Sequence, residues 1–221
     1  MSSEVQMPPR NLLELGNRLS KYVVGAEGNI SCKNKEDSFV IKASGCSMAN
    51  MTNESVITCD LDGNKVSEGK GRPSMEVSFH SWLYRNTDCK VIAHTHPTNV
   101  MKILCGGLTK LFASTRLFPD QVVFNDTSAC VVPYATPGED LVKEISYATE
   151  KHGRSPKLIL LENHGIICCA KDFNQALTMT QICDKAAEIF VSIQPFSPSY
   201  LTEEQVHKIV NHESEIYRRS L

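Results

Sequence analysis

The sequence predicts a mixed α/β fold with a largely antiparallel sheet, and two observations support this class. Runs of strand-like segments come before runs of helical segments, without the strict strand-helix-strand rhythm of a parallel sheet. Asp62-Gly63 is a hairpin signal between two strand-like stretches. The 221 residues, 41% of them hydrophobic, fall in the range where one core buries roughly 70% of the unfolded surface. We therefore expect one domain over residues 1–221.

The first third of the chain predicts an amphipathic helix followed by antiparallel strands. Leucines recur at helical spacing after Pro8 and Pro9, charges occupy the opposite face, and Gly25 ends the pattern. Glycine and small polar residues then indicate turns, and short apolar stretches indicate strands. The expected elements are a helix over residues 10–24, turns over 25–34, and strands over 38–45 and 55–60.

The middle third predicts helices with recognisable ends and short strands between them. Pro73 and Ser74 indicate a helix start, and Gly106 with Gly107 indicates a helix stop. A later helix has a proline, an acidic first turn and a closing glycine. The expected elements are a helix over residues 71–86, a strand over 89–94, a short helix over 95–107, strands over 121–124 and 129–134, and a helix over 137–153.

The last third predicts two buried strands and then two helices. The strands lie within residues 157–172 and are joined by a turn at residues 163–165. A long helix follows over residues 173–194. Pro195 and Pro198 separate it from a last helix over residues 201–221, which opens with a capping box from Thr202 to Gln205.

Composition and charge exclude several classes of protein. The formal charge is −2, and no basic block offers the electrostatic footprint of a nucleic-acid binder. No apolar stretch has the length of a signal peptide or approaches the roughly 20 residues of a membrane span. The nine cysteines are odd in number and form no CxxC pair, which favours reduced thiols in the cytoplasm, with Cys168 and Cys169 as core residues.

Two histidines stand one residue apart at the end of the apolar stretch in KVIAHTHPTN, residues 90–99. Because alternate side chains of a strand point to one face, His94 and His96 converge if this segment is extended. Three protein ligands with one open position define a catalytic zinc site, and His164, also at a turn after an apolar strand, is the best third ligand. Hydrogen-bonded histidines at a strand end give the same pattern, so other residues must decide.

The remaining four histidines differ in their surroundings. His152, His207 and His212 lie on polar helix segments, where we expect surface positions. His80 follows Glu76 by four residues, so the two share a helix face and can approach one cleft.

Three segments carry the small polar residues that favour an anion. The amides at the start of the 71–86 helix, with the Ser74 hydroxyl, suit a phosphate, and the loops GAEGNIS and KASGCSM can fold around one. Each also has a simpler interpretation. Ser74 and Glu76 serve equally well as helix capping residues, and the two loops as ordinary turns.

Taken together, the motifs resemble the class II aldolase/adducin family over roughly residues 10–193. The matching elements are GNIS at 28–31, Ser44-Gly45, PSME at 73–76 with His80, HTHP at 94–97, PYATPG at 133–138 and NHG at 163–165. The resemblance implies a three-layer fold, with helices on both sides of a mostly antiparallel sheet. It also implies a homo-oligomer, most often a tetramer with active sites at subunit contacts. Residues 199–221 are then a C-terminal helical extension.

The resemblance also implies roles for individual residues. His94, His96 and His164 match zinc ligands, one ion per subunit, with another divalent metal as an alternative. Glu76 matches the acid/base carboxylate, which can also approach the metal when substrate is absent. A further set matches positions that hold a sugar phosphate: Gly28, Asn29, Ser44, Gly45 and Ser74.

Two departures from the family pattern concern substrate binding. Met75 stands where the fuculose-phosphate aldolases have a second serine, which removes one phosphate-binding hydroxyl. The segment 115–129 lacks the tyrosine that a neighbouring subunit supplies in those enzymes. Arg116, Asp120 and Tyr134 are candidates for a second acid/base or substrate-binding group, although Tyr134 also suits a structural role.

We therefore expect a zinc-dependent lyase that cleaves a ketose 1-phosphate into dihydroxyacetone phosphate and an aldehyde. A sugar-phosphate 4-epimerase or a decarboxylase of the same family is the alternative within enzymes. A non-catalytic, adducin-like scaffold is the alternative of another class, and a structural zinc site is a third possibility. The resemblance implies a small-molecule sugar phosphate as the partner, and the charge and hydropathy above favour neither nucleic acid nor a membrane.

Overall fold

The computed structural model describes residues 10–68 and 70–220, and the strands in these residues form one seven-stranded sheet in the order β3-β2-β1-β4-β7-β6-β5. β5 and β6 pair in parallel, and the other neighbouring strands pair antiparallel. This confirms the expected class. The strands are β1 (Asn29–Lys35), β2 (Ser38–Lys42), β3 (Val56–Asp60), β4 (Val91–Thr95), β5 (Cys130–Val132), β6 (Leu158–Leu161) and β7 (Gly165–Ala170).

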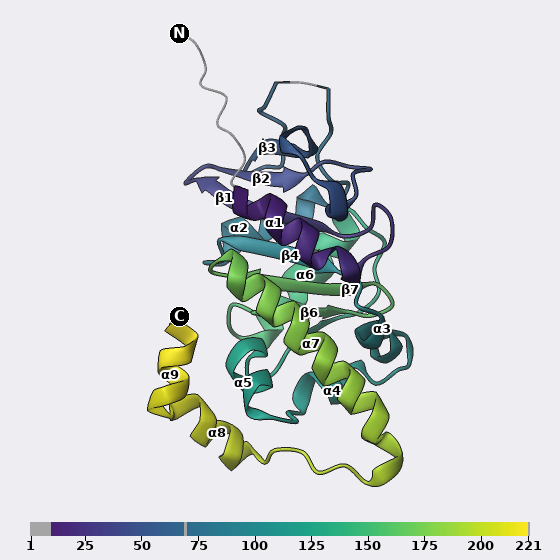
Figure 1. The fold of residues 1–221 in the computed structure, drawn as a ribbon, viewed down its shortest axis with the longest axis vertical. Helices are drawn as coiled ribbons and strands as arrows, with labels where there is room; N and C mark the ends of the chain where they lie inside the picture. The colour runs from purple at the N-terminus through teal and green to yellow at the C-terminus, as the bar shows by residue number, and fades with distance from the viewer. Residues whose placement is uncertain (1–9, 69, 221) are drawn as a thin grey trace.

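Helices cover both faces of the sheet, as the three-layer prediction requires (Figure 1). One face packs against α1, α3 and α7, and the other against α2 and α6, and each face has its own apolar cluster. Within the described residues the helices are α1 (Arg10–Leu19), α2 (Val77–Asn86), α3 (Thr98–Cys105), α4 (Thr109–Ser114), α5 (Pro119–Asn125), α6 (Glu139–His152), α7 (Phe173–Ile193), α8 (Glu203–Asn211) and α9 (Glu213–Ser220).

Two predicted elements have the wrong type. The turn segment 25–34 contains β1, a central strand that pairs with β2 and β4 and whose first four residues are buried. The predicted strand 121–124 lies in α5, where Pro119 occupies the first turn and the apolar residues pack against α7. In both cases tertiary contacts outweigh the local preference of the residues.

Two helix boundaries also differ from the prediction. α2 begins at Val77 rather than at Pro73, so Ser74 lies before the helix and Glu76 occupies the N-cap position. The predicted last helix is two helices, α8 and α9, which break at His212, whose backbone is extended. The capping box from Thr202 to Gln205 is present. Pro8, Pro9 and Leu221 lie outside the described residues.

The two ends of the sheet differ in what they carry. β1 begins beside the end of β4, because Asn29 pairs with His94, and β7 begins there as well, because Ile166 pairs with Thr95. The predicted site residues on these strands therefore gather at one end. The C-terminal helices α8 and α9 lie beside α5 at the lower left of Figure 1. No helix among the described residues combines the length and hydropathy of a membrane span.

Candidate metal centre

Two local structures bring the three histidines together. His94 lies on β4 and His96 directly follows it, while His164 lies in the turn between β6 and β7. Asn163 adopts a left-handed conformation in this turn, with a φ of 56°, which asparagine tolerates better than most residues. A Cβ at Gly165 would lie 2.5 Å from Cδ2 of His96, so the close approach of the turn requires glycine.

The imidazole rings face one point. The Nε2 atoms of His94 and His96 are 3.0 Å apart, and one nitrogen from each of the three rings lies within 4.8 Å of the others. The His94 ring is fully buried, and its Nδ1 donates to the Ile166 carbonyl oxygen at 2.9 Å. When the ring is neutral, the proton on Nδ1 leaves the lone pair of Nε2 free for a cation.

Glu76 closes the fourth side of this cluster. Its Oε2 lies 3.2 Å from Nε2 of His94, and its Oε1 lies 3.2 Å from Nε2 of His164. Burial opposes ionisation of this carboxyl, but the charge of His94 and the close approach of His94 and His164 hold its pKa well below its usual range. Burial works against the His94 cation as well, and the neighbouring Glu76 raises the pKa of His94.

A buried chain of hydrogen bonds fixes Glu76 from behind. The Asn29 amide nitrogen donates to Oε2 of Glu76 at 2.8 Å, and Oδ1 of Asn29 contacts Nε2 of His80. Nδ1 of His80 lies 2.7 Å from the Ser31 hydroxyl, which lies 2.6 Å from the Tyr84 hydroxyl. Asn29 therefore positions the carboxylate, in addition to the phosphate-binding role implied by the resemblance.

The donor and acceptor types fix the direction of this chain. An ionised Glu76 only accepts, so the Asn29 amide donates and its oxygen must accept from Nε2 of His80. Burial lowers the pKa of His80 to about 3, so the ring is neutral and its Nδ1 accepts from Ser31. Tyr84 then donates to Ser31. The shared helix face of Glu76 and His80 was visible in the sequence, whereas Ser31 and Tyr84 come together only in the folded chain.

Glu27 holds the His96 ring in position, as Asn29 holds Glu76. This role was not predicted from the sequence. Its Oε2 lies 3.4 Å from Nδ1 of His96 and also accepts the Val24 backbone N–H at 3.0 Å. The His96 backbone N–H donates to the Tyr22 carbonyl oxygen at 3.1 Å. The loop before β1 thus wraps around His96. Burial and the charges of His94 and His164 lower the pKa of His96 to about 4.

The predicted phosphate-binding segments lie beside this centre. Gly28 has a φ of +63°, and a Cβ there would lie 2.6 Å from the His94 carbonyl oxygen. The Ser44 backbone N–H donates to the Arg72 carbonyl oxygen, and the Ser74 backbone N–H donates to the Lys42 carbonyl oxygen. The strand before Ser44-Gly45 and the segment that holds Ser74 are therefore neighbours.

Lys42 connects two of these segments. It was not among the site residues predicted from the sequence. Its side chain is 2% exposed, and Nζ donates to the carbonyl oxygens of Ala26 at 3.1 Å and Cys46 at 2.5 Å. Burial lowers the pKa of Lys42, while the nearby Cys46 and Glu76 act in the opposite direction. A buried cation between two glycine loops is the clearest electrostatic feature for an anion in this region.

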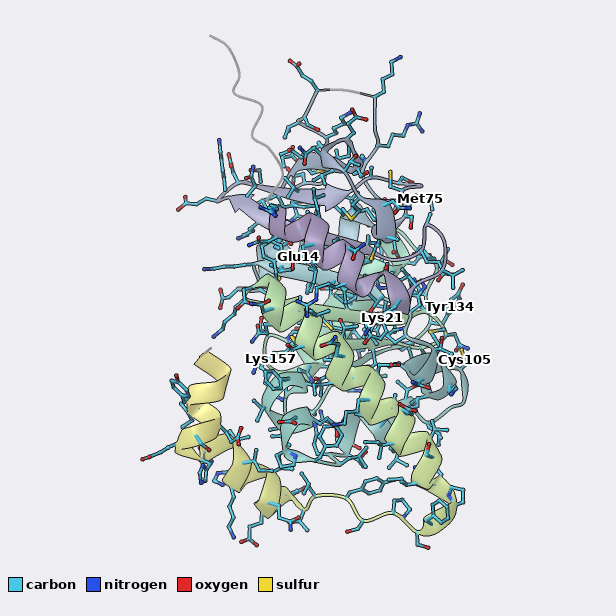
Figure 2. All side chains as sticks on the ribbon, in the orientation of Figure 1. Glu14, Lys21, Met75, Cys105, Tyr134 and Lys157 are labelled. Atoms are coloured by element: carbon cyan, nitrogen blue, oxygen red, sulfur yellow. The ribbon has the colours of Figure 1, made fainter. Side chains whose placement is uncertain are left out.

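Arg116, Asp120 and Tyr134 are the remaining candidates for an acid/base or substrate-binding group. Arg116 is buried and donates to backbone carbonyl oxygens, which include that of Asp126 at 2.6 Å, so it has a structural role. Asp120 is on α5, which packs chiefly against α7 and α8. Tyr134 and Met75 are 61% and 84% exposed and lie along the same side of the molecule in Figure 2.

The other predictions concern histidines and cysteines. His207 and His212 are exposed, and His152 is half-buried. Cys168 and Cys169 are buried, as predicted. Among the described residues, the group that can hold a metal consists of the three histidines and includes no cysteine. This donor set leaves a position open for substrate, unlike a closed structural site with four protein ligands.

Residues 12–191 match the family model described as Class II Aldolase and Adducin N-terminal domain. A 3-oxo-tetronate 4-phosphate decarboxylase from Haemophilus influenzae is 28% identical over 193 residues, which cover 86% of this chain and 89% of the relative. An L-fuculose phosphate aldolase from Methanocaldococcus jannaschii is 30% identical over 176 residues, which cover 76% and 86%.

A solved structure of L-fuculose 1-phosphate aldolase has the same fold. It superposes with a TM-score of 0.78 at 22% identity, and the match covers 99% of this chain and 98% of that one.

Proposed function

Because the chain belongs to the class II aldolase and adducin family, we propose that it is a zinc-dependent lyase that cleaves a carbon–carbon bond near the ketone of a phosphorylated sugar. The observation that carries this proposal is the convergence of His94, His96 and His164 against Glu76. Three imidazoles and a carboxylate suit zinc, and they also suit some other divalent cations.

The three histidines are proposed to hold the metal. A zinc ion there would supply a Lewis acid for the negative charge that develops on substrate oxygens. The Nδ1 atoms of His94 and His96 are engaged by Ile166 and Glu27, so both rings are fixed with Nε2 toward the centre. Such outer contacts orient ligands and raise metal affinity.

Glu76 is the proposed acid/base. Retro-aldol cleavage leaves an electron pair on the carbon beside the ketone, and this carbon must gain a proton. The ionised carboxylate can take a proton from that carbon in the condensation direction and return it in the cleavage direction. Asn29 holds Oε2 of Glu76 in place for this transfer. General acid/base catalysis is typically worth about a hundred- to ten-thousandfold in rate.

The phosphate is proposed to bind where the loops at Gly28-Asn29 and Ser44-Gly45 meet Ser74. Lys42 supports this assignment, because it places a buried cation between the two loops. Met75 supplies no hydroxyl, and its side chain is 84% exposed. The proposed grip therefore uses backbone amides, the Ser44 and Ser74 hydroxyls and the charge of Lys42.

Aldol cleavage of a ketose 1-phosphate is the first candidate reaction. Decarboxylation is the second, and the 28% identity to a 3-oxo-tetronate 4-phosphate decarboxylase over 86% of the chain favours it. Loss of carbon dioxide from such an acid leaves dihydroxyacetone phosphate, which is also the ketone product of the aldol cleavage. Both reactions leave an electron pair on the same carbon. They differ in the fragment that departs.

The test is to incubate the zinc-loaded chain with L-fuculose 1-phosphate and, separately, with 3-oxo-tetronate 4-phosphate. Dihydroxyacetone phosphate is measured in both, together with aldehyde in the first and carbon dioxide in the second. Product from one substrate identifies the reaction, and an epimer without aldehyde would indicate the epimerase. If the zinc-loaded chain forms product from neither, or if Glu76→Gln leaves the rate unchanged, the proposed mechanism is wrong.

An adducin-like scaffold is the competing proposal from another class. An interaction module has no physical need for three converging imidazoles beside a carboxylate, so retention of stoichiometric zinc by the purified chain would argue against it. Native mass spectrometry measures this metal content and also tests the predicted homotetramer. The cytoplasmic location stays a prediction.

A further inference from the structure

The end of the sheet opposite the histidines carries a pair of thiols that the proposed lyase does not use. Cys89 comes just before β4, and Cys169 lies near the end of β7. The Lys90 backbone N–H donates to the Ala170 carbonyl oxygen at 2.8 Å. Each cysteine directly precedes one of the two residues that this hydrogen bond joins. His94 lies toward the other end of β4.

Both side chains belong to the buried cluster on one face of the sheet, and each thiol affects the pKa of the other. Cys168, the neighbour of Cys169, points to the opposite face of the sheet, where its Sγ lies 3.5 Å from the Thr180 hydroxyl. This follows from the alternation of side chains along a strand. Cys169 is therefore the member of this consecutive pair that faces Cys89.

Both thiols line a pocket of about 540 Å³ between this end of the sheet and the C-terminal helices. Val210 of α8 and Ile216 of α9 form the opposite wall. Lys157 also lines the pocket and lies across the molecule from Met75 in Figure 2. Cys89 and Cys169 are each 7% exposed, and both line this pocket.

The surroundings make the two thiols unequal. A hydrogen bond from Cys169 lowers the pKa of Cys89, and the Thr87 hydroxyl and the charge of Lys33 act in the same direction against burial. The Thr87 Oγ1 lies 3.1 Å from Sγ of Cys89. The contact with Cys89, together with burial, raises the pKa of Cys169 well above its ordinary value. Of the two thiols, Cys89 therefore ionises more readily than Cys169.

We propose that Cys89 is a site of oxidation by peroxides and that Cys169 resolves the product into a Cys89–Cys169 disulfide. The Cys89 sulfur attacks one peroxide oxygen, the O–O bond breaks, and one water leaves, with sulfenic acid on Cys89. The Cys169 sulfur then attacks the Cys89 sulfur, the S–O bond breaks, and a second water leaves with the Cys169 proton. Two thiols lose two electrons, and one peroxide becomes two waters.

The test uses the full-length, metal-loaded chain with hydrogen peroxide as the probe. After treatment the free thiols are alkylated, and the protein is digested with trypsin without reduction. Cleavage at lysine and arginine gives peptides 86–90 and 158–171, which carry Cys89 and Cys169. We expect a linked pair of these peptides that grows with peroxide and disappears on reduction.

Three variants locate the bond. Cys168→Ala should still form the linked pair, since it removes the other thiol of peptide 158–171. Cys105→Ser removes an exposed thiol and should leave the reaction unchanged. Cys169→Ser should abolish the link and leave a sulfenic acid on Cys89 that dimedone traps.

The proposal is overturned if Cys105 or Cys46 is oxidised while Cys89 and Cys169 remain fully alkylatable, or if the link is lost in Cys168→Ala. Should Cys169→Ser fail to fold, alkylation rates in the unmodified chain decide. Cys89 should then react at least about tenfold faster than the buried Cys32, whose pKa burial raises to about 12. Equal rates would contradict the proposal.

Discussion

Strands β4 and β7 carry reactive side chains at both ends, and the two ends are organised differently. At the histidine end, His94, His96 and Glu76 are each held from behind by another group, so their remaining polar atoms face one point. At the cysteine end, Cys89 and Cys169 lie in one buried cluster and line one pocket, with each thiol affecting the pKa of the other. A metal centre therefore requires neighbouring groups that bind the polar atoms of each ligand on the side away from the metal. A thiol pair requires only that the two sulfurs lie close together.

Removal of a proposed metal ligand should have the largest effect, because it should abolish zinc binding at the histidine end alone. We expect His94→Ala to lose far more than the roughly 100-fold in zinc affinity that outer-shell changes cost, because it removes a fully buried ligand. Competition with a chromophoric chelator measures the affinity. Cys89→Ser, at the other end of β4, is the control and should keep its zinc. Stoichiometric zinc in both variants would disprove the assignment.

Glu76→Gln should separate chemistry from metal binding at the histidine end. The amide keeps the shape of the side chain but cannot accept a proton, so we expect kcat to fall by about a hundred- to ten-thousandfold. Zinc content, measured in the same preparation, should stay near one ion per chain if the histidines carry the binding. A variant with wild-type kcat would assign the proton transfer to another group.

Glu27→Gln tests whether a group that holds a histidine from outside the centre contributes to zinc binding. Its carboxylate lies 3.4 Å from Nδ1 of His96, so its removal should weaken zinc binding by about 10- to 100-fold. Glu36→Gln, in the exposed turn between β1 and β2, is the matched control. If both variants bind zinc equally well, the carboxylate does not orient His96.

Lys42→Met should affect the anion more than the metal. The ammonium group of Lys42 donates to the loops at Ala26 and Cys46, and hydrogen bonds to charged groups are worth about 1.5 to 3 kcal/mol. We expect KM for the phosphorylated substrate to rise about tenfold or more, with zinc content unchanged. Lys143→Met, on the exposed face of α6, should leave KM as it is. An unchanged KM in Lys42→Met would remove Lys42 from the phosphate site.

The sequence predicted the three histidines that converge at this centre better than the groups that support them. His94 and His96 follow from strand alternation, and His164 from its position after an apolar strand. Glu27, Lys42 and Ser31 could not be assigned, because each has a partner in a different segment that only the fold brings to it.

The two misassigned elements have the same physical origin. β1 is rich in polar residues with weak strand preference, yet its place between β2 and β4 buries its first four residues. The valines of α5 favour a strand locally, but α5 packs as a helix against α7. Local preference was decisive only where tertiary packing agreed with it.

The last and smallest expected effect concerns the pH dependence of stability, which His80 at the histidine end should influence. Burial lowers its pKa from 6.5 to about 3, so between these values the unfolded chain binds a proton that the folded chain does not. Stability should therefore fall with decreasing pH below about 6.5, by up to about 1.4 kcal/mol per pH unit. Urea unfolding of the metal-free chain between pH 7 and pH 5 measures this slope. In His80→Gln, the pH dependence of the unfolding free energy should decrease by the contribution of about one proton. The exposed His207→Gln is the control and should keep the slope of the unmodified chain. Equal slopes in the two variants would show that the fold does not hold His80 neutral.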